Sequence, residues 1–347
     1  MLSLYAIFHL NLAFSSIEEE LRPEVIRKCY WPLLRLAKDL ELPLGIEASA
    51  YTLEVIESID PDWIEELRLL CNDQCEFIAS GYSQLIGPLV PAEVNEANLR
   101  IGLKRYHEFG LYPEIALVNE QAYSAGLIEH YLKAGFKAII MEWDNPASDH
   151  HNWDREWGYL PQYATDGSGH EIPLIWNRAI VFQKFQRYVH GEQELAGHLT
   201  YLKNHGAGFQ RFLPVYGNDV EIFDFRPGRF QTEAMLGKES EWERIKNLFV
   251  AILTEPRFDM TKPSALLNYL DVPHAGNRLH LESACQPIPV KKQPKYNISR
   301  WALTGRDDLR INTECWSIYQ ILKVNGFDDD QLWQELCYLW SSDFRTH

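Results

Sequence analysis

The feature that most constrains the fold is a strand–helix–strand pattern between residues 114 and 141. An apolar run over 114–118 stops at Asn119 and Glu120, a stretch with helical spacing of apolar residues follows, and Gly135 separates it from a second apolar run. This order predicts two parallel buried strands joined by a helix. Polar residues at the carboxyl end of such strands face ligand sites. Glu120 is therefore a candidate functional residue, and its structural alternative is a carboxylate near a helix start, with Asn119 as the cap.

The same pattern recurs along the chain, and nearly every apolar run ends in a polar or charged residue. We expect seven strands, within 4–8, 43–47, 75–79, 114–118, 136–141, 172–181 and 212–216. Seven strands alternating with helices or long loops predict an α/β fold, a (β/α)7-type barrel with one polar rim. An open doubly wound sheet is the alternative. Its dinucleotide-binding version lacks support, because no glycine-rich turn follows the first strand.

The pattern changes to helices after about residue 236, where apolar residues recur at helical spacing near 242–252 and 311–322. Acidic residues at 328–330 are typical of the start of a last helix. We therefore expect two regions. Residues 1–235 form a catalytic (β/α)7 barrel, and residues 236–347 form a helical carboxyl-terminal region that packs on the barrel and completes the site.

The composition narrows the class of partner. A net charge of −16 repels phosphate backbones and anionic lipids, so nucleic acid and membranes are poor partners. The 11 tryptophans and 17 tyrosines supply flat faces with a polar edge, on which sugar rings stack. Six cysteines without a paired framework indicate reduced thiols and a cytoplasmic location. The apolar start of the chain is interrupted by His9 and Asn11, which favours a first strand over a secretory signal.

Two carboxylates on opposite sides of a cleft are what cleavage of a glycosidic bond requires. Glu120 and Asp219 both stand at expected strand ends, and a barrel brings the ends of distant strands around one pocket. The neighbouring acids Glu221 and Asp224 would raise the proton affinity of Asp219 through like-charge repulsion, which suits a general acid.

At this point the chain resembles glycoside hydrolase family 57, and the resemblance extends over nearly the whole sequence. Its ordered motifs have counterparts at His9–Asn11, 75–82, 117–123, 219–223 and Ser341–Phe344. The resemblance implies a (β/α)7 barrel followed by a helical region, and a retaining glycosidase or glucan-remodelling enzyme acting on α-linked sugars. It further implies that Glu120 is the nucleophile and Asp219 the general acid/base, with no cofactor and no metal needed for the chemistry.

The resemblance also implies that His9, Glu76 and Asp343 line the sugar site. To these we add residues that lie in the motifs or beside strand ends: Asn11, Tyr82, Trp143, Arg178 and Glu221. The chain departs from the family at Asn11, where many members have a second histidine, and at Asn119, where many have proline. These departures bear on the identity of the sugar substrate more than on the type of reaction.

Several alternatives remain at the sequence level. An Asn-Glu pair after a fourth strand is similar to the arrangement in retaining (β/α)8 glycosidases, where Glu120 would be the acid/base. A transglycosylase shares the first half-reaction. Asp149, His150 and His151 would hold a metal in a polysaccharide deacetylase. A barrel that binds carbohydrate without catalysis is the last alternative.

A group of arginines stands out in so acidic a chain: Arg226, Arg229, Arg300, Arg306 and Arg310. Guanidinium groups that face the cleft would select an anionic substrate. The alternative is that they pair with Asp224, Asp307 and Asp308. The expected partner is in either case an oligo- or polysaccharide, and the oligomeric state is not predicted.

Overall fold

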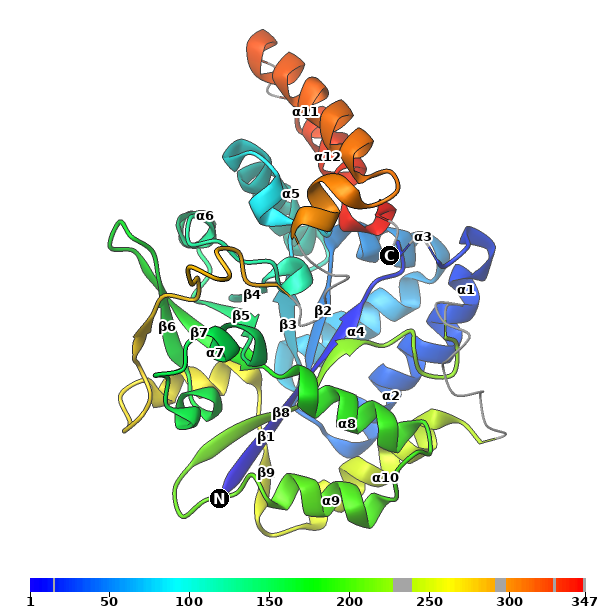
Figure 1. The fold of residues 1–347 in the computed structure, drawn as a ribbon. Helices are drawn as coiled ribbons and strands as arrows, with labels where there is room; N and C mark the ends of the chain where they lie inside the picture. The colour runs from blue at the N-terminus through cyan, green and yellow to red at the C-terminus, as the bar shows by residue number, and fades with distance from the viewer. Residues whose placement is uncertain (15, 227–238, 291–297, 327–328, 346–347) are drawn as a thin grey trace.

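The computed structural model describes residues 1–14, 16–226, 239–290, 298–326 and 329–345. Arg229, Asp328 and the expected boundary near 235 lie outside these residues. A curled sheet forms the centre of the molecule, with helices around it and the helix pair α11 and α12 projecting beyond α5 (Figure 1). No described helix combines the length and apolar character needed to span a bilayer.

The seven expected strands are present and run parallel. They are β1 (Leu2–Leu10), β2 (Gly45–Ala48), β3 (Glu76–Ala79), β4 (Ile115–Leu117), β5 (Ala138–Glu142), β7 (Glu171–Asn177) and β8 (Arg211–Asp219). Their order across the sheet is β7-β5-β4-β3-β2-β1-β8, with parallel pairing at each step. The expected α/β barrel of the (β/α)7 type is confirmed.

Three short strands extend this sheet and were not predicted. β6 (Gln162–Thr165) pairs antiparallel with β7, β10 (Arg278–Leu279) pairs with β6, and β9 (Phe258–Met260) pairs with β1. The last two come from the region expected to be helical, so that region also adds strands to the barrel. The division at residue 235 stays a prediction.

Helices cover the outer face of the sheet. Those that follow the first three strands are α1 (Arg22–Val25), α2 (Trp31–Leu40), α3 (Ala50–Ile59), α4 (Pro61–Asp73) and α5 (Ala92–Glu108). Those after the remaining strands are α6 (Leu127–Lys133), α7 (Asp144–Asp149), α8 (Ala179–Val189) and α9 (Leu195–Lys203). The carboxyl-terminal helices are α10 (Glu241–Thr254), α11 (Asp308–Asn325) and α12 (Asp330–Leu339).

The chain between β1 and α2 forms irregular helical turns. A 3-10 turn over Glu19–Leu21 precedes α1 and has no side-chain cap, and a π-helical turn over Ile26–Tyr30 joins α1 to α2. Pro32 lies in the first turn of α2, directly after this π-helical turn.

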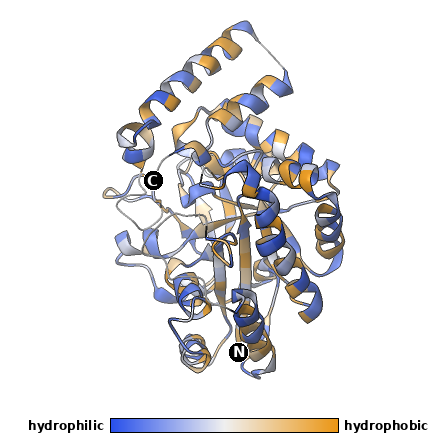
Figure 2. Ribbon diagram, turned by 90° about the vertical axis from the view of Figure 1, so that its right-hand side faces the viewer, coloured by the Kyte–Doolittle hydropathy of each residue, from blue (hydrophilic) through white to orange (hydrophobic). Residues whose placement is uncertain are grey.

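The core has two faces because successive side chains of a strand point to opposite sides. Figure 2 shows hydrophobic residues concentrated along the central strands. One face packs against the helices. The other fills the barrel interior with Tyr5, Ile7, Ile78, Ile115, Leu117, Ala138, Ile140, Ile175 and Phe212. Polar residues that continue this inward alternation at the carboxyl ends of the strands point into the same space.

A side-chain contact links the two ends of the seven-stranded array. Strands β7 and β8 do not pair through backbone hydrogen bonds in the strand order. Instead, Asn177 Nδ2 donates to the Gly217 carbonyl at 2.8 Å. Gly217 is required there, because a Cβ at this position would overlap the Asn177 side chain. The curled sheet is therefore tied together next to Asp219, at the rim of the barrel.

Candidate active site

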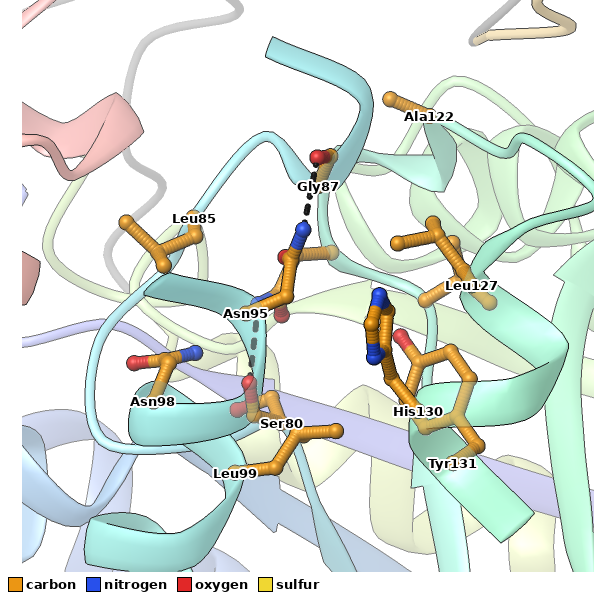
Figure 3. Close-up of a pocket in the computed structure, with 12 residues that line it drawn as sticks. Ser80, Leu85, Gly87, Asn95, Asn98, Leu99, Ala122, Leu127, His130 and Tyr131 are labelled. Carbon is orange, nitrogen blue, oxygen red and sulfur yellow. Dashed lines mark hydrogen bonds between the residues drawn. The ribbon is translucent and has the colours of Figure 1, made fainter. Parts of the chain in front are cut away.

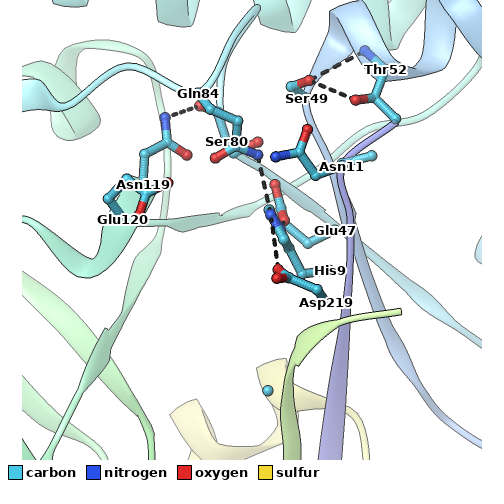
Figure 4. A network of polar contacts seen from close by, with 12 residues as sticks. His9, Asn11, Glu47, Ser49, Thr52, Ser80, Gln84, Asn119, Glu120 and Asp219 are labelled. Carbon is cyan, nitrogen blue, oxygen red and sulfur yellow. Dashed lines mark hydrogen bonds and ion pairs between the residues drawn. The ribbon is translucent and has the colours of Figure 1, made fainter. Parts of the chain in front are cut away.

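The register of the parallel strands brings His9, Glu47 and Asp219 together. In the parallel pairing, His9 stands opposite Glu47 on β2 and opposite Asp219 on β8. His9 Nδ1 contacts Glu47 Oε2, and Nε2 lies 3.8 Å from Asp219 Oδ1 and 3.5 Å from Gln84 Nε2. Figure 4 shows the imidazole between the two carboxyl groups. Protonated His9 would be an ion-pair partner to both, because each ring nitrogen then donates.

Glu47 belongs to this cluster, although it is absent from the residues expected from sequence. Its side chain is fully buried and contacts His9, whose imidazole, when protonated, is the charged partner that a buried carboxylate requires. The sequence signal was present, since 43–47 was an expected strand that ends in a carboxylate.

Glu120 is held on a strained turn rather than in a helix. The segment Asn119–Gln121 is a 3-10 turn, and Glu120 and Gln121 have φ values of 54° and 53°, in the left-handed region. Helix α6 begins only at Leu127. The helix-cap alternative for Asn119 and Glu120 is therefore wrong. Strain of this kind costs about 1–3 kcal/mol per residue and is concentrated at functional sites.

Asn119 fastens this turn to the neighbouring loop. Its Nδ2 donates to the Ser80 carbonyl at 2.8 Å and approaches the Ser83 carbonyl at 3.4 Å. Behind the turn lies a cavity of about 20 Å³, with Leu127 and His130 on one side (Figure 3). Ser80 Oγ and Asn119 Oδ1 also line it and are buried without a hydrogen-bond partner among the described residues. The cavity has the size and polarity to hold one water molecule.

The carboxyl-terminal segment reaches into the same site. Ser342 Oγ donates to Glu120 Oε1 at 3.0 Å, and Asn11 Nδ2 donates to Asp343 Oδ1 at 2.7 Å. The pKa of Asp343 is raised to about 6, chiefly by burial and also by the charges of Glu120 and Asp219, while hydrogen bonds from Ser341 and Asn11 oppose the rise. Asp343 is therefore within electrostatic range of both expected catalytic carboxyl groups.

Glu221 lies beneath the site and is fully enclosed. The Asn11 amide donates to its Oε1 at 2.7 Å, and the Tyr30 hydroxyl also donates to it. Burial raises the pKa of Glu221 to about 7, with the charge of Asp219 as the next cause, while the bonds from Tyr30 and Asn11 lower it. Glu221 is thus coupled to Asp219, and its enclosed position makes it a support for the site.

Glu142 is a further buried acid that was not among the expected site residues. It ends β5 and points inward, and its Oε1 accepts from the amides of Asp144 and Ala179 at 3.0 and 2.9 Å. The pKa of Glu142 is raised to about 8, chiefly by burial and next by the charge of Asp144, while the two amides oppose the rise. The sequence signal was the expected strand that ends at this position.

Three other expected residues are not brought to the His9–Asp219 cluster by any described contact. Tyr82 is buried and its hydroxyl donates to Glu54 at 3.0 Å. Trp143 is buried against Trp176, with ring centres 5.0 Å apart. The Arg178 guanidinium lies 4.8 Å from the centre of the Tyr159 ring. Their contacts with substrate stay predictions.

Glu76 is separated from the site, against the expectation. It is the first residue of β3, pairs with Gly45 rather than with the rim, and accepts from the Ser264 amide at 2.8 Å. Burial raises its pKa. Its place at the amino-terminal end of β3, opposite the polar rim, accounts for this separation.

The arginines with described ion pairs face acidic residues. Arg226 contacts Glu241, Arg306 pairs with Asp307 at 2.7 Å, and Arg310 pairs with Glu314 at 2.8 Å. Among the described residues no group of three His, Cys, Asp or Glu side chains is arranged to hold a metal ion. His150 instead stacks on Trp153 at 4.2 Å.

Comparison with known proteins agrees with this geometry. Residues 8–176 match the sequence model of glycosyl hydrolase family 57. The resemblance to family 57 is confirmed. No curated protein sequence matches the chain. Solved structures with the same fold include a 4-alpha-glucanotransferase from Thermococcus litoralis, which is 16% identical with a TM-score of 0.64. The match covers 94% of this chain and 46% of that enzyme, so this chain spans less than half of its length.

Two further structures are similar over most of both chains. The alpha-amylase AmyC from Thermotoga maritima is 12% identical with a TM-score of 0.67, and the match covers 99% of this chain and 88% of AmyC. A family 57 branching enzyme from Thermococcus kodakaraensis is 11% identical with a TM-score of 0.64, covering 91% and 78% of the two chains. At these identities the similarity establishes the fold, that of family 57 (β/α)7 barrel enzymes.

Proposed function

We propose that this chain is a retaining glycoside hydrolase of the family 57 type that acts on an α-linked oligo- or polysaccharide. Glu120 is the nucleophile and Asp219 the general acid/base. The observation that carries the proposal is that one turn and one strand end bring these carboxyl groups together. Ser342 Oγ donates to Glu120 Oε1 at 3.0 Å, and the adjacent Asp343 accepts from Asn11 at 2.7 Å. His9, two residues before Asn11, lies 3.8 Å from Asp219 Oδ1. Three carboxyl groups that converge in one polar rim are what glycosyl transfer through a carboxylate requires.

The chemistry follows in two displacements. A Glu120 oxygen attacks the anomeric carbon while Asp219 gives its proton to the departing glycosidic oxygen, so the C–O bond breaks as the glycosyl–enzyme ester forms. Asp219 then removes a proton from water, which attacks the anomeric carbon and releases Glu120. This two-step mechanism requires the carboxyl groups of Glu120 and Asp219 to stand about 5–5.5 Å apart in the productive complex.

The surrounding residues support these roles. Ser342 orients Glu120 through the 3.0 Å hydrogen bond to Oε1. His9 lies between Glu47 and Asp219 and positions Asp219, the group that donates and removes the proton. The strained turn at Glu120 presents its side chain beyond the strand end. Residues 341–345, from the region after 236, thereby complete a site built on the barrel.

The substrate is proposed to be a neutral sugar. Arg226, Arg306 and Arg310 each pair with a glutamate or aspartate of this chain. We therefore do not assign these side chains to the binding of an anionic substrate. The site itself contains the nucleophilic carboxylate of Glu120, whose charge would repel a uronic acid. The six free cysteines favour a cytoplasmic location.

The test is turnover of a panel of α- and β-linked aryl glycosides, uronic acids included, by the wild type and Glu120→Gln, with and without chelator. Cleavage of a neutral α-glycoside that is lost in the variant and unaffected by chelator supports the proposal. Loss with chelator favours the deacetylase-type alternative, and binding without turnover favours a non-catalytic barrel. Adding an oligosaccharide acceptor and measuring product length separates hydrolysis from transglycosylation.

A further inference from the structure

The segment Ser341–Arg345 joins the site to the helices that follow the barrel. Ser341 pairs with Leu85 in an isolated bridge, and the Ser342 amide donates to the Gln84 carbonyl at 2.8 Å. A 3-10 turn over Ser342–Phe344 then places Ser342 against Glu120 and Asp343 against Asn11. The site therefore depends on where this short turn is held.

Arg345 ends the turn and is fully buried. Its Nη1 donates to the Trp301 carbonyl at 2.6 Å and its Nη2 to Asn312 Oδ1 at 2.9 Å. Asp308 Oδ1 lies 3.7 Å from Nη1, and Asp308 is also fully buried. Asn312 Oδ1 accepts a second bond, from Trp340 Nε1 at 2.9 Å. Residues on both sides of the turn are thus tied to helix α11.

A buried ion pair of this kind is an expensive way to gain stability. Asp308 Oδ1 and Oδ2 and Arg345 Nε have no hydrogen-bond partner among the described residues. Desolvation of two charges offsets much of their attraction when the remaining polar atoms are unsatisfied. Arg306 and Arg310, by contrast, make exposed surface pairs. Because the buried pair adds little stability for its desolvation cost, we look for another role. The adjacent turn, which carries Ser342 and Asp343, indicates that this role is to hold the turn in place.

We propose that Arg345 is a positioning residue of the active site, which fixes Ser342 and Asp343 by anchoring their turn to the Trp301 carbonyl, Asn312 and Asp308. The inference rests on the proposed function, because it assigns the turn a part in glycosyl transfer. A catalytic arrangement has to be held within about 0.5 Å, and a displacement of about 1 Å can cost 100-fold in rate.

The test is a double-mutant cycle on kcat/KM with the substrate found in the aryl glycoside panel. The variants are Arg345→Met, Asp343→Asn and the two combined, with Arg310→Met as the control, since Arg310 is exposed and pairs with Glu314 within helix α11. Arg345→Met is expected to lower kcat/KM at least about 10-fold. Arg345→Lys should recover part of the loss, because an ammonium group can still donate to the Trp301 carbonyl.

If Arg345 acts through its turn, the double variant loses little more activity than Asp343→Asn alone. Fully additive losses, or Arg345→Met with the activity of Arg310→Met, overturn the proposal. Near-ultraviolet circular dichroism checks that each variant is folded, and Arg345→Lys keeps the test valid if Arg345→Met is not. Glu120→Gln separates the two claims. If it stays active, the proposed nucleophile is wrong, while the coupling between residues 343 and 345 is still measured.

Discussion

Ser342 Oγ donates a hydrogen bond of 3.0 Å to Glu120 Oε1, although 222 positions separate the two residues in the chain. One residue follows a barrel strand and the other follows the last helix. The bond shows that the end of the chain is part of the barrel's polar rim. It also stabilises the ionised form of Glu120, which is the form a nucleophile needs.

Ser342→Ala should therefore lower kcat/KM by about 10- to 100-fold, since a hydrogen bond to a charged group contributes about 1.5–3 kcal/mol. The acidic limb of the pH profile should move to higher pH, because the carboxylate loses a donor. Ser317→Ala is the control, as Ser317 is exposed and donates to the Thr313 carbonyl of its own helix. An unchanged acidic limb in Ser342→Ala would contradict the role given to this bond.

Glu47→Gln and Glu76→Gln form a matched pair that locates the site. Glu47 contacts His9 at the rim, whereas Glu76 caps Ser264 at the amino end of β3. The first variant should lower kcat/KM by about 10- to 100-fold, because the imidazole loses its charged partner. The second should leave kcat/KM within about twofold. Steady-state kinetics of both variants measure the two losses in kcat/KM. A larger loss in Glu76→Gln than in Glu47→Gln would return Glu76 to the site.

Stability should fall as pH rises. Burial holds the folded-state pKa of Glu221 at about 7 and of Glu142 at about 8, above their ordinary values. The folded chain therefore binds protons more tightly than the unfolded chain. The stabilisation is complete below about pH 4.5 and is lost as pH rises through the folded values. Urea unfolding at pH 5, 6, 7 and 8 measures this slope.

Glu221→Gln should reduce that slope, because an amide keeps the acceptor for Asn11 and Tyr30 but does not titrate. Glu20→Gln, at an exposed position, is the control and should keep the slope of the wild type. A Glu221→Gln protein with the full slope would show that Glu221 does not cause it.

Gly217→Ala should destabilise the barrel closure. A Cβ on Gly217 would overlap Asn177, whose side chain donates to the Gly217 carbonyl. We expect a loss of about 1–3 kcal/mol in the free energy of unfolding. Gly208→Ala is the control, because no atom lies within 4 Å of its added Cβ. In an Asn177→Ala background the Gly217→Ala substitution should cost less, and an equal cost there would refute the overlap as the cause.

Local patterns predicted the barrel strands because each buried strand has an apolar run and a polar end. The break of α3 and α4 at Asp60–Pro61 was also predictable, since proline starts a helix but cannot continue one. Strands β6, β9 and β10 were not predictable in this way. They are two to four residues long and owe their structure to pairing with β7, β1 and β6.

The site was predictable only in part. Glu120 and Asp219 stood out at strand ends. The expected strands 43–47 and 75–79 also place Glu47 at a strand end and Glu76 near a strand start, so the different positions of these two glutamates were predictable. The anchoring of Ser342 and Asp343 by Arg345 depends on tertiary contacts with Trp301 and Asn312, which no local pattern contains.

The most direct test of the account is covalent trapping. The protein is incubated with a 5-fluoroglycosyl fluoride of the accepted sugar, digested and analysed by mass spectrometry. The account predicts one glycosyl group per chain, bound to the peptide that contains Glu120, and no labelling of Glu120→Gln. Labelling of Asp219 or another carboxylate instead, or turnover of the same sugar with inversion of the anomeric centre, would contradict it.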